Sequence, residues 1–320
     1  MLLRTVMVAH ATLDAIDAAM DADGGARFRV LEGELFPQAD DAFRGEDGGH
    51  RGHLGASVLG RECAREIWYG FRWTHREPFE PRMLRLFNRG HLEEPRMVAL
   101  LLMINCKFWQ YDASGKQFRI EFADGHGGGS GDGVGRGIPD LPADTAFVSE
   151  FKTHGENSFI KLAGKLDDWR KHRKRQGPFT GEGVRLAKYE HFVQMQIYMH
   201  KMGLAAALYM AVNKNTDDLY AEVVHLDTEV AEQFVNRGEK LVEMREPPKR
   251  ISESPGFYKC RFCGKRPVCH LGAAPQLNCR TCASVEPRPG GVWHCTRHQV
   301  PLDKARQAQG CTDYAVNPAI

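Results

Sequence analysis

The stretch VSEFKTHGENSF, residues 148–159, places two charged side chains in a segment that is otherwise typical of a core strand. Because residues two apart on an extended strand share a face, Glu150 and Lys152 project to the same side, while apolar residues such as Phe151 anchor the strand. Asp132, in the turn-forming GDGVG, can converge with Glu150 and bind a hard cation such as Mg²⁺ or Mn²⁺ through oxygen. Lys152 would then position the metal-bound water or neutralise charge that develops on a phosphate. A surface ion pair on an edge strand is the alternative interpretation.

The segments around this strand predict an α/β fold. A helix with Leu13, Ile16 and Met20 on one face is expected near the start, followed by loop up to about residue 50. We expect helices at 81–103, 158–172 and 187–202 and one that begins at Ser57, and strands at 117–123, 133–138, 145–153, 205–214 and 219–226. The glycine-rich 125–131 is expected to be a loop. This order favours an α/β sandwich around a small mixed sheet.

Composition and charge are those of an ordinary globular protein of 320 residues, with 42% hydrophobic residues and a net charge of +2. No apolar run reaches the roughly 18 residues of a membrane-spanning helix, and Asp14 and Asp17 interrupt the apolar N-terminal stretch, so a cytoplasmic protein is expected. One basic run stands out, and its members are Lys161, Lys165, Arg170, Lys171, Arg173, Lys174 and Arg175. This run is a solvated helix end, or a phosphate-contacting strip if other features indicate nucleic acid.

Nine cysteines in a chain expected to be cytoplasmic favour metal ligation over disulfides. KCRFCGKRPVC spaces Cys260, Cys263 and Cys269 as C-x2-C-x5-C, and Cys63 makes four thiolates, enough for a 4Fe–4S cluster or a zinc ion. His270 is a competing fourth ligand that favours zinc. Cys63 can also be read as a small buried hydrophobe, on a helical stripe with Leu59, Ile67 and Phe71.

A second group of cysteines follows the polar, proline-containing segment 243–257, which is typical of a linker. A C-x2-C pair and two more distant cysteines predict a zinc site, with the residues Cys279, Cys282, Cys295 and Cys311 and with His294 and His298 as alternative donors. The remaining Cys106 is expected in the core.

A series of motifs runs along the chain in a fixed order. Gly90, His91 and Glu94 lie on one helix, then come Asp132, Glu150-x-Lys152 and, on a later helix, Gln194-x-x-x-Tyr198. The series resembles that of the RecB-like branch of the PD-(D/E)XK nucleases, over residues 55 to about 270, and is most similar to phage exonucleases and CRISPR-associated RecB-like nucleases. The placing of Cys63 and of the C-x2-C-x5-C group resembles the iron–sulfur staple of AddB and its CRISPR-associated relatives.

The resemblance implies a restriction-endonuclease-like core at 51–255, between an N-terminal segment at 1–50 and a cysteine cluster at 256–272, with a zinc-type tail at 273–320. Asp132 and Glu150 would be metal ligands, with Glu94 or, as second candidate, His91. Lys152 would be the catalytic lysine. By the same resemblance, two residues of a later helix would shape the site or touch the DNA backbone, namely Gln194 and Tyr198.

The function that these features favour is a divalent-metal-dependent DNA exonuclease of phage recombination or DNA processing. Its cofactors would be Mg²⁺ or Mn²⁺, a 4Fe–4S cluster or zinc, and Zn²⁺. Its partners would be DNA and a single-strand annealing protein, without a membrane, in the cytoplasm of a bacterial host. The alternatives are a non-catalytic metal-stapled DNA-binding module and a CRISPR-adaptation-type nuclease.

Overall fold

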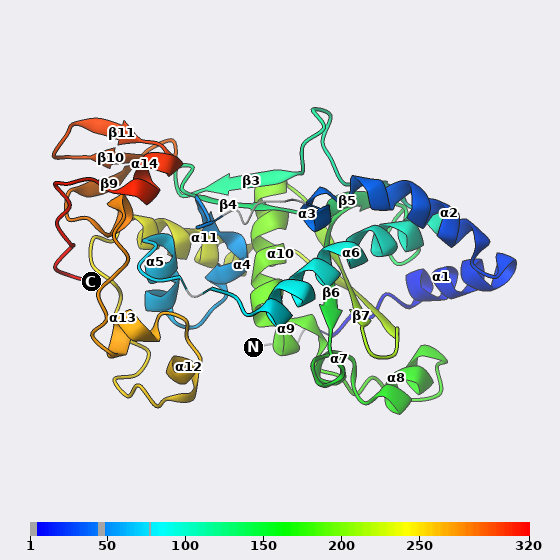
Figure 1. The fold of residues 1–320 in the computed structure, drawn as a ribbon. Coiled ribbons are helices and arrows are strands. Elements are labelled where there is room, and N and C mark those ends of the chain that lie inside the picture. The colour runs from blue at the N-terminus through cyan, green and yellow to red at the C-terminus, as the bar shows by residue number, and fades with distance from the viewer. Residues whose placement is uncertain (1–4, 44–48, 77) are drawn as a thin grey trace. The chain divides into compact units, whose positions relative to one another are not determined.

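The computed structural model describes residues 5–43, 49–76 and 78–320, and the chain divides into two compact units (Figure 1). Unit 1 contains the described residues of Met1–Asp47, Glu80–Arg119 and Ser130–Ala231. Unit 2 contains those of Gly48–Phe79, Ile120–Gly129 and Glu232–Ile320. Each unit is therefore assembled from three separate stretches of the sequence, and each is described by itself below.

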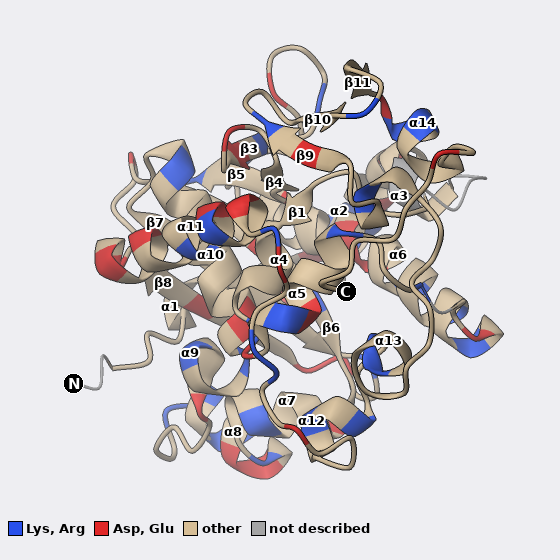
Figure 2. Ribbon diagram, turned by 90° about the vertical axis from the view of Figure 1, so that its left-hand side faces the viewer, with Lys and Arg blue, Asp and Glu red and all other residues tan. Residues whose placement is uncertain are grey.

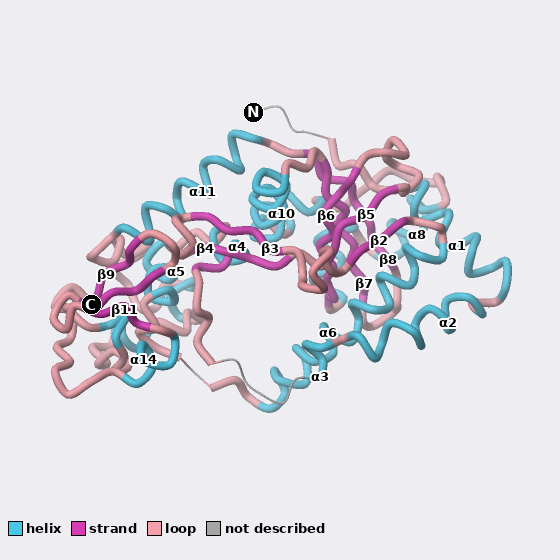
Figure 3. Tube along the Cα trace, turned by 90° about the horizontal axis from the view of Figure 1, so that it is seen from above, coloured by secondary structure: helices cyan, strands magenta, loops and turns pink. Residues whose placement is uncertain are grey.

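A five-stranded mixed sheet forms the centre of unit 1. Its strand order is β2 (Lys107–Trp109), β5 (Gly133–Arg136), β6 (Ala146–His154), β7 (Ala206–Asn213) and β8 (Leu219–His225). The pairing of β6 with β7 is parallel and the other three pairings are antiparallel. Figure 3 shows the strands β5 to β8 side by side. Every residue of β7 is buried, so this strand lies in the core, and the expected mixed α/β class is confirmed.

Four helices connect β6 to β7, as a parallel pairing requires a crossover. They are α7 (Glu156–Ala163), α8 (Leu166–Arg173), α9 (Gly183–Ala187) and α10 (Tyr189–Met202). The prediction of a single helix at 158–172 is wrong, because the helix is interrupted at Gly164. This glycine has φ 94°, and a Cβ there would lie 2.2 Å from the Thr180 hydroxyl oxygen. The helix expected at 187–202 is present as α10.

The N-terminal part of unit 1 is helical and packs with the long helix α6 (Pro81–Met103). The expected amphipathic helix is α1 (His10–Asp23), in which Leu13 and Ile16 are buried. The prediction of a loop after α1 is wrong, because three helical elements follow it, namely α2 (Ala26–Leu35), η1 (Phe36–Gln38) and α3 (Asp40–Phe43). Phe28 is the buried residue of α2, so this helix has almost no apolar periodicity that could reveal it.

Unit 2 contains a small sheet in the order β1 (Leu54–Gly55), β4 (Gly127–Ser130) and β3 (Arg119–Phe122), together with α11 (Thr228–Glu243), which begins in unit 1. The loop expected at 125–131 is wrong, because β4 pairs in parallel with β1. The helix expected to run from Ser57 is also wrong. It is divided into α4 (Ala56–Leu59) and α5 (Ala64–Phe71), and Cys63 is the N-cap of α5.

The C-terminal part of unit 2 consists of short elements. They are α12 (Tyr258–Arg261), α13 (Arg266–His270), η2 (Cys279–Thr281), α14 (Lys304–Gln309) and an antiparallel sheet of β9 (Val285–Arg288), β10 (Val292–Cys295) and β11 (Val300–Leu302). None of the described helices has both the length and the apolar character that a membrane crossing requires.

A stack of indole rings and guanidinium groups joins this C-terminal part to the helical part of unit 2. In order, the stack contains Trp68, Arg72, Trp293, Arg280 and Trp73, all almost fully buried. The distances from guanidinium carbon to ring centroid along the stack are 5.2, 5.0, 4.5 and 3.9 Å. Such cation–π contacts are strongest where water is excluded. The C-terminal segment thus contributes to the core of unit 2.

Candidate active site

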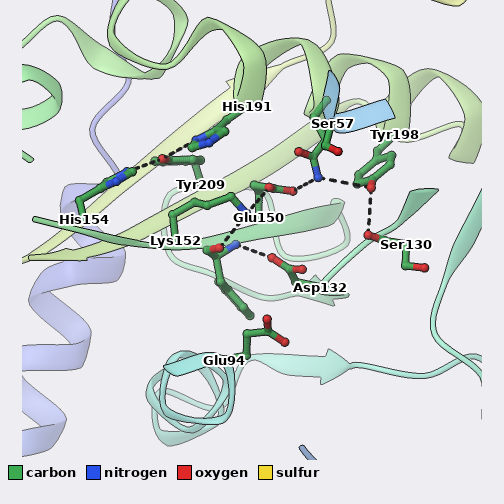
Figure 4. A network of polar contacts seen from close by, with 12 residues as sticks. Ser57, Glu94, Ser130, Asp132, Glu150, Lys152, His154, His191, Tyr198 and Tyr209 are labelled. Carbon is green, nitrogen blue, oxygen red and sulfur yellow. Dashed lines mark hydrogen bonds and ion pairs between the residues drawn. The ribbon is translucent and has the colours of Figure 1, made fainter. Parts of the chain in front are cut away.

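The two charged residues of β6 lie side by side, as the strand period predicts. Glu150 is fully buried and Lys152 is partly exposed. The Lys152 ammonium forms an ion pair with Oε1 of Glu150 and donates to the carbonyl oxygen of Phe151 at 2.9 Å (Figure 4). A buried carboxylate that is paired with a lysine lies at this position, in a central strand of the sheet rather than at its edge.

Asp132 lies beside this pair because β5 begins at the next residue and pairs with β6. Its Oδ2 accepts a hydrogen bond from the amide N–H of Phe151 at 2.6 Å. Gly133 has φ 154°, and a Cβ there would lie 2.4 Å from the ring of Phe108. A side chain would therefore push the start of β5 away, so this glycine helps to direct Asp132 toward β6.

The electrostatics of the site are those of several carboxylates around one ammonium. The pKa of Asp132 is raised to about 8, mainly by burial and also by Glu150 and Glu94, while Lys152 and the Phe151 amide oppose the rise. Burial also raises the pKa of Glu150. The pKa of Lys152 is raised, because the nearby carboxylates outweigh the effect of burial. Such a cluster has an excess of oxygen ligands and negative charge, which suits a hard divalent cation.

Glu94 and His91 lie one helical turn apart on α6, with Nδ1 of His91 3.4 Å from Oε1 of Glu94. Both line a cavity of ≈ 470 Å³ that also reaches Asp132, Lys116 and Arg119. The charge of Glu94 acts on Asp132, on Glu150 and on Lys152. Both residues therefore lie near Asp132, and the choice of Glu94 before His91 stays a prediction.

The two residues predicted on the later helix reach the same site from α10. The side-chain amide of Gln194 donates to Oε2 of Glu150 at 2.9 Å and lies 3.3 Å from the hydroxyl of Tyr198. That hydroxyl donates to the carbonyl oxygen of Ser130 at 2.9 Å, two residues before Asp132. Gln194 and Tyr198 thus connect Glu150 on β6 with the segment that carries Asp132.

A hydrogen-bonded group that the sequence reasoning missed adjoins these residues. The Tyr209 hydroxyl lies 2.9 Å from Nε2 of His154 and 3.0 Å from Nδ1 of His191 (Figure 4). Tyr209 is directly opposite Glu150 in the pairing of β6 with β7. Burial, with nearby lysines, lowers the pKa of both histidines to about 3, so both are neutral near pH 7. Neither of these two imidazoles therefore adds a positive charge near Lys152.

Sequence signals for this group existed, but each was weak. His154 lies four residues after Glu150 and so shares its face of β6, and His191 precedes Gln194 by almost one turn of α10. Tyr209 comes from a third element, whose pairing register could not be read from the sequence.

The basic run lies on and around α7 and α8, and part of it is engaged in ion pairs. Arg170 binds Asp218 through two hydrogen bonds of 3.0 and 2.7 Å. Arg173 pairs with Asp14 and Asp17, and Arg175 pairs with Asp14. Lys161 lies 3.9 Å from Glu182. Lys165, Lys171 and Lys174 are exposed.

Electrostatic effects link several cysteines of unit 2 to other members of the two expected groups. Burial raises the pKa of Cys260, and Cys63 and Cys269 raise it further. The pKa of Cys263 is raised to about 11 by burial, with contributions from Cys63 and Cys269. The thiol of Cys63 therefore lies within electrostatic reach of the C-x2-C-x5-C group, at the N-terminus of α5.

In the second group, effects of the same kind link Cys279 to three other thiols. Burial raises the pKa of Cys279, and Cys311, Cys282 and Cys295 raise it further. The alternative donor His298 lies 3.9 Å from the Cys311 sulfur. Over the described parts of the chain, no three His, Cys, Asp or Glu side chains are arranged closely enough to hold a metal ion, so the two cysteine sites and the carboxylate site all stay predictions.

The ninth cysteine is buried in unit 1. Burial raises the pKa of Cys106 to about 11, as expected of a core thiol. The expectation that it lies in the core is therefore confirmed.

Comparisons with known proteins give only distant likenesses. No protein-family model matches the chain, and no curated protein matches it. An alkaline exonuclease from Laribacter hongkongensis, LHK-Exo, shares 15% identity at a TM-score of 0.37, over 63% of this chain and 90% of that one. LHK-Exo in complex with dAMP matches with 15% identity and a TM-score of 0.37, over 59% and 86%. SSO0001 shares 14% identity at a TM-score of 0.36, over 75% and 95%. Likeness at this level decides neither fold nor activity.

Proposed function

We propose that the protein is a divalent-metal-dependent DNA exonuclease with a restriction-endonuclease-like core of the PD-(D/E)XK type. The observation that carries the proposal is the convergence of Glu94, Asp132 and Glu150 around Lys152 in unit 1. Two carboxylates, Asp132 and Glu150, whose pKa values are raised by burial and by the charge of Glu94, are costly to keep ionised without a cation. A phosphodiester is a suitable substrate, because its hydrolysis needs both a metal-bound water and a positive group near the developing charge.

Each side chain has a defined task in this proposal. Asp132, Glu150 and Glu94 would hold Mg²⁺ or Mn²⁺, which supplies Lewis-acid activation of the phosphate and of a water molecule. Lys152 keeps its proton at neutral pH and stabilises charge that develops on the phosphate oxygens. Gln194 holds Glu150 in place through its amide, and Tyr198 fixes the segment before Asp132.

The cysteine groups are proposed as structural metal sites of unit 2. Cys63, Cys260, Cys263 and Cys269 would hold a 4Fe–4S cluster, with zinc as the alternative, in an AddB-type arrangement. The tail group, Cys279, Cys282, Cys295 and Cys311, would hold Zn²⁺. The effects of the other thiols on the pKa of Cys260 and of Cys279 support both groupings. Metal analysis of anaerobically purified protein should find iron with matching sulfide. If it finds only zinc, at about two ions per chain, the first group is a second zinc site and not a cluster.

A role in phage recombination or DNA processing, with a single-strand annealing protein as partner, follows as the proposed setting. The exposed lysines Lys165, Lys171 and Lys174 would contact phosphates, so binding of DNA should weaken steeply with salt.

The test is degradation of an end-labelled linear duplex with Mg²⁺ or Mn²⁺, beside a covalently closed circle of the same sequence. We expect the wild type to degrade the linear DNA alone, and Lys152→Ala to lose at least about 100-fold in rate, as removal of a charge-stabilising group does. Lys201→Ala, an exposed lysine of α10, is the matched control and should keep full activity. DNA binding without cleavage, unchanged by Lys152→Ala, would instead favour a non-catalytic DNA-binding module.

A further inference from the structure

A long stretch of unit 2 is free of acidic residues. From residue 254 to residue 285 the sequence contains neither Asp nor Glu, although the whole chain has 41 acidic residues against 43 Lys and Arg. The stretch contains five cations, namely Lys259, Arg261, Lys265, Arg266 and Arg280. Figure 2 shows Lys and Arg on its two short helices, α12 and α13. Lys259 forms an ion pair with Glu62, which lies outside the stretch in the sequence. The cations of the stretch still outnumber this one carboxylate, so its local charge favours an anionic partner.

Two aromatic rings of the same stretch face the solvent. Phe262 is 82% exposed and Tyr258 is 62% exposed. The guanidinium carbon of Arg261 lies 5.6 Å from the Phe262 ring centroid, and the ammonium of Lys259 lies 5.6 Å from the Tyr258 ring centroid. Each exposed ring thus has a cation beside it. Burial of these rings in a complex would remove a large apolar area from contact with water.

The segment that carries the two rings is ordered by backbone hydrogen bonds. The amide of Arg261 donates to the carbonyl of Phe257 at 2.8 Å, and the amide of Cys263 donates to the carbonyl of Cys260 at 3.1 Å. Cys260 is buried, and it anchors the turn whose next two residues are Arg261 and Phe262. Binding would therefore need little ordering of this segment, which lowers its entropic cost.

We propose that this surface, defined by Tyr258, Lys259, Arg261 and Phe262, binds single-stranded DNA. Unpaired bases would stack on the two rings, and Arg261, which is exposed, would contact a backbone phosphate. Duplex DNA keeps its bases stacked within the helix and cannot use the rings in this way. An acidic peptide would satisfy the cations but not both exposed rings. The choice of DNA over RNA rests on the proposed function.

The proposal is tested on the full-length protein by fluorescence anisotropy with a labelled oligothymidylate and with a hairpin duplex. No divalent ion is added, so the result does not depend on whether the protein cleaves DNA. The combined change Tyr258→Ala and Phe262→Ala should weaken binding of the single strand at least about 5-fold for each ring, as loss of a base stack does. Binding of the duplex should change by less than about 2-fold.

Matched variants separate stacking from loss of structure. Phe79→Ala removes another exposed ring of unit 2, 54% exposed, and should leave binding unchanged. Phe262→Trp should keep the affinity, and Arg261→Glu should lower it even if both rings are present. The idea is overturned if the double variant binds the oligonucleotide as the wild type does, or if both DNA forms lose affinity equally. It is also overturned if the variant loses binding to vesicles of anionic phospholipid instead.

Discussion

The affinity of the site for Mn²⁺ should weaken about tenfold for each pH unit below about 8. Metal binding requires ionised carboxylates, and the pKa of Asp132 is raised to about 8 in unit 1. At pH 6, which is two pH units below this pKa, the metal must displace a proton from Asp132 in order to bind. The apparent dissociation constant should therefore be about 100-fold larger than at pH values above 8. The pKa of Glu150 is also raised, which can only make the dependence steeper.

Rising pH should strengthen metal binding but should lower the stability of the metal-free fold. A carboxyl group whose pKa is higher in the folded state binds its proton more tightly there. Its contribution to stability is therefore present at low pH and is lost as pH rises from about 4 to about 8. In the absence of metal, the melting temperature should fall over this window, and Mn²⁺ should restore it above pH 8.

Isothermal titration calorimetry from pH 6 to pH 9 measures the affinity. Repeating each titration in two buffers of different ionisation enthalpy counts the protons released, which should be about one or more at pH 6. Asp132→Asn should remove most of the binding and make the remaining pH dependence shallower, because only the raised pKa of Glu150 is left. Asp144→Asn, at an exposed residue of the same unit, should leave both unchanged. An affinity that does not vary between pH 6 and pH 8 in the wild type would refute the reasoning.

Three other changes test the packing of each unit. Tyr209→Phe removes a hydroxyl that is hydrogen-bonded to two imidazole nitrogens, so the free energy of unfolding in urea should fall by about 1–3 kcal/mol. The control Tyr258→Phe, at an exposed residue, should lower it by less than about 0.5 kcal/mol. Gly133→Ala should cost about 1–3 kcal/mol by overpacking and should also weaken Mn²⁺ binding; normal metal binding in this variant would contradict the proposed position of Asp132. Arg280→Ala removes a guanidinium that lies 3.9 Å from a ring centroid, so tryptophan fluorescence should shift to the red, and an unchanged spectrum would contradict the stack.

Local periodicity predicted the parts of the site that lie on single elements. The two-residue period placed Glu150 and Lys152 on one face of β6, and the four-residue spacing placed Gln194 and Tyr198 on one face of α10. The approach of Asp132 to Glu150 followed from the expectation that neighbouring strands pair. These inferences held because each needed only the geometry of one element or of one pairing.

Other parts depended on contacts that no local pattern reveals. The break at Gly164 lies inside a helical pattern that continues on both sides, and β4 consists mainly of glycine, which has no side chain to signal a strand. Tyr209 meets His154 and His191 only because three elements pack together. The roles of the site residues and the metals of the cysteine groups remain predictions.

The interleaving of the two units has a consequence for synthesis on the ribosome. The chain passes from one unit to the other five times, and the last passage occurs near residue 231. Trp68 and Trp73 emerge early, but Arg280 and Trp293, which cover them, emerge more than 200 residues later. At roughly 5–20 residues per second, these indole rings wait for about 10–40 s without their partners. A nascent chain would therefore present an aromatic surface to chaperones throughout that interval, and neither unit can be released by a single proteolytic cut.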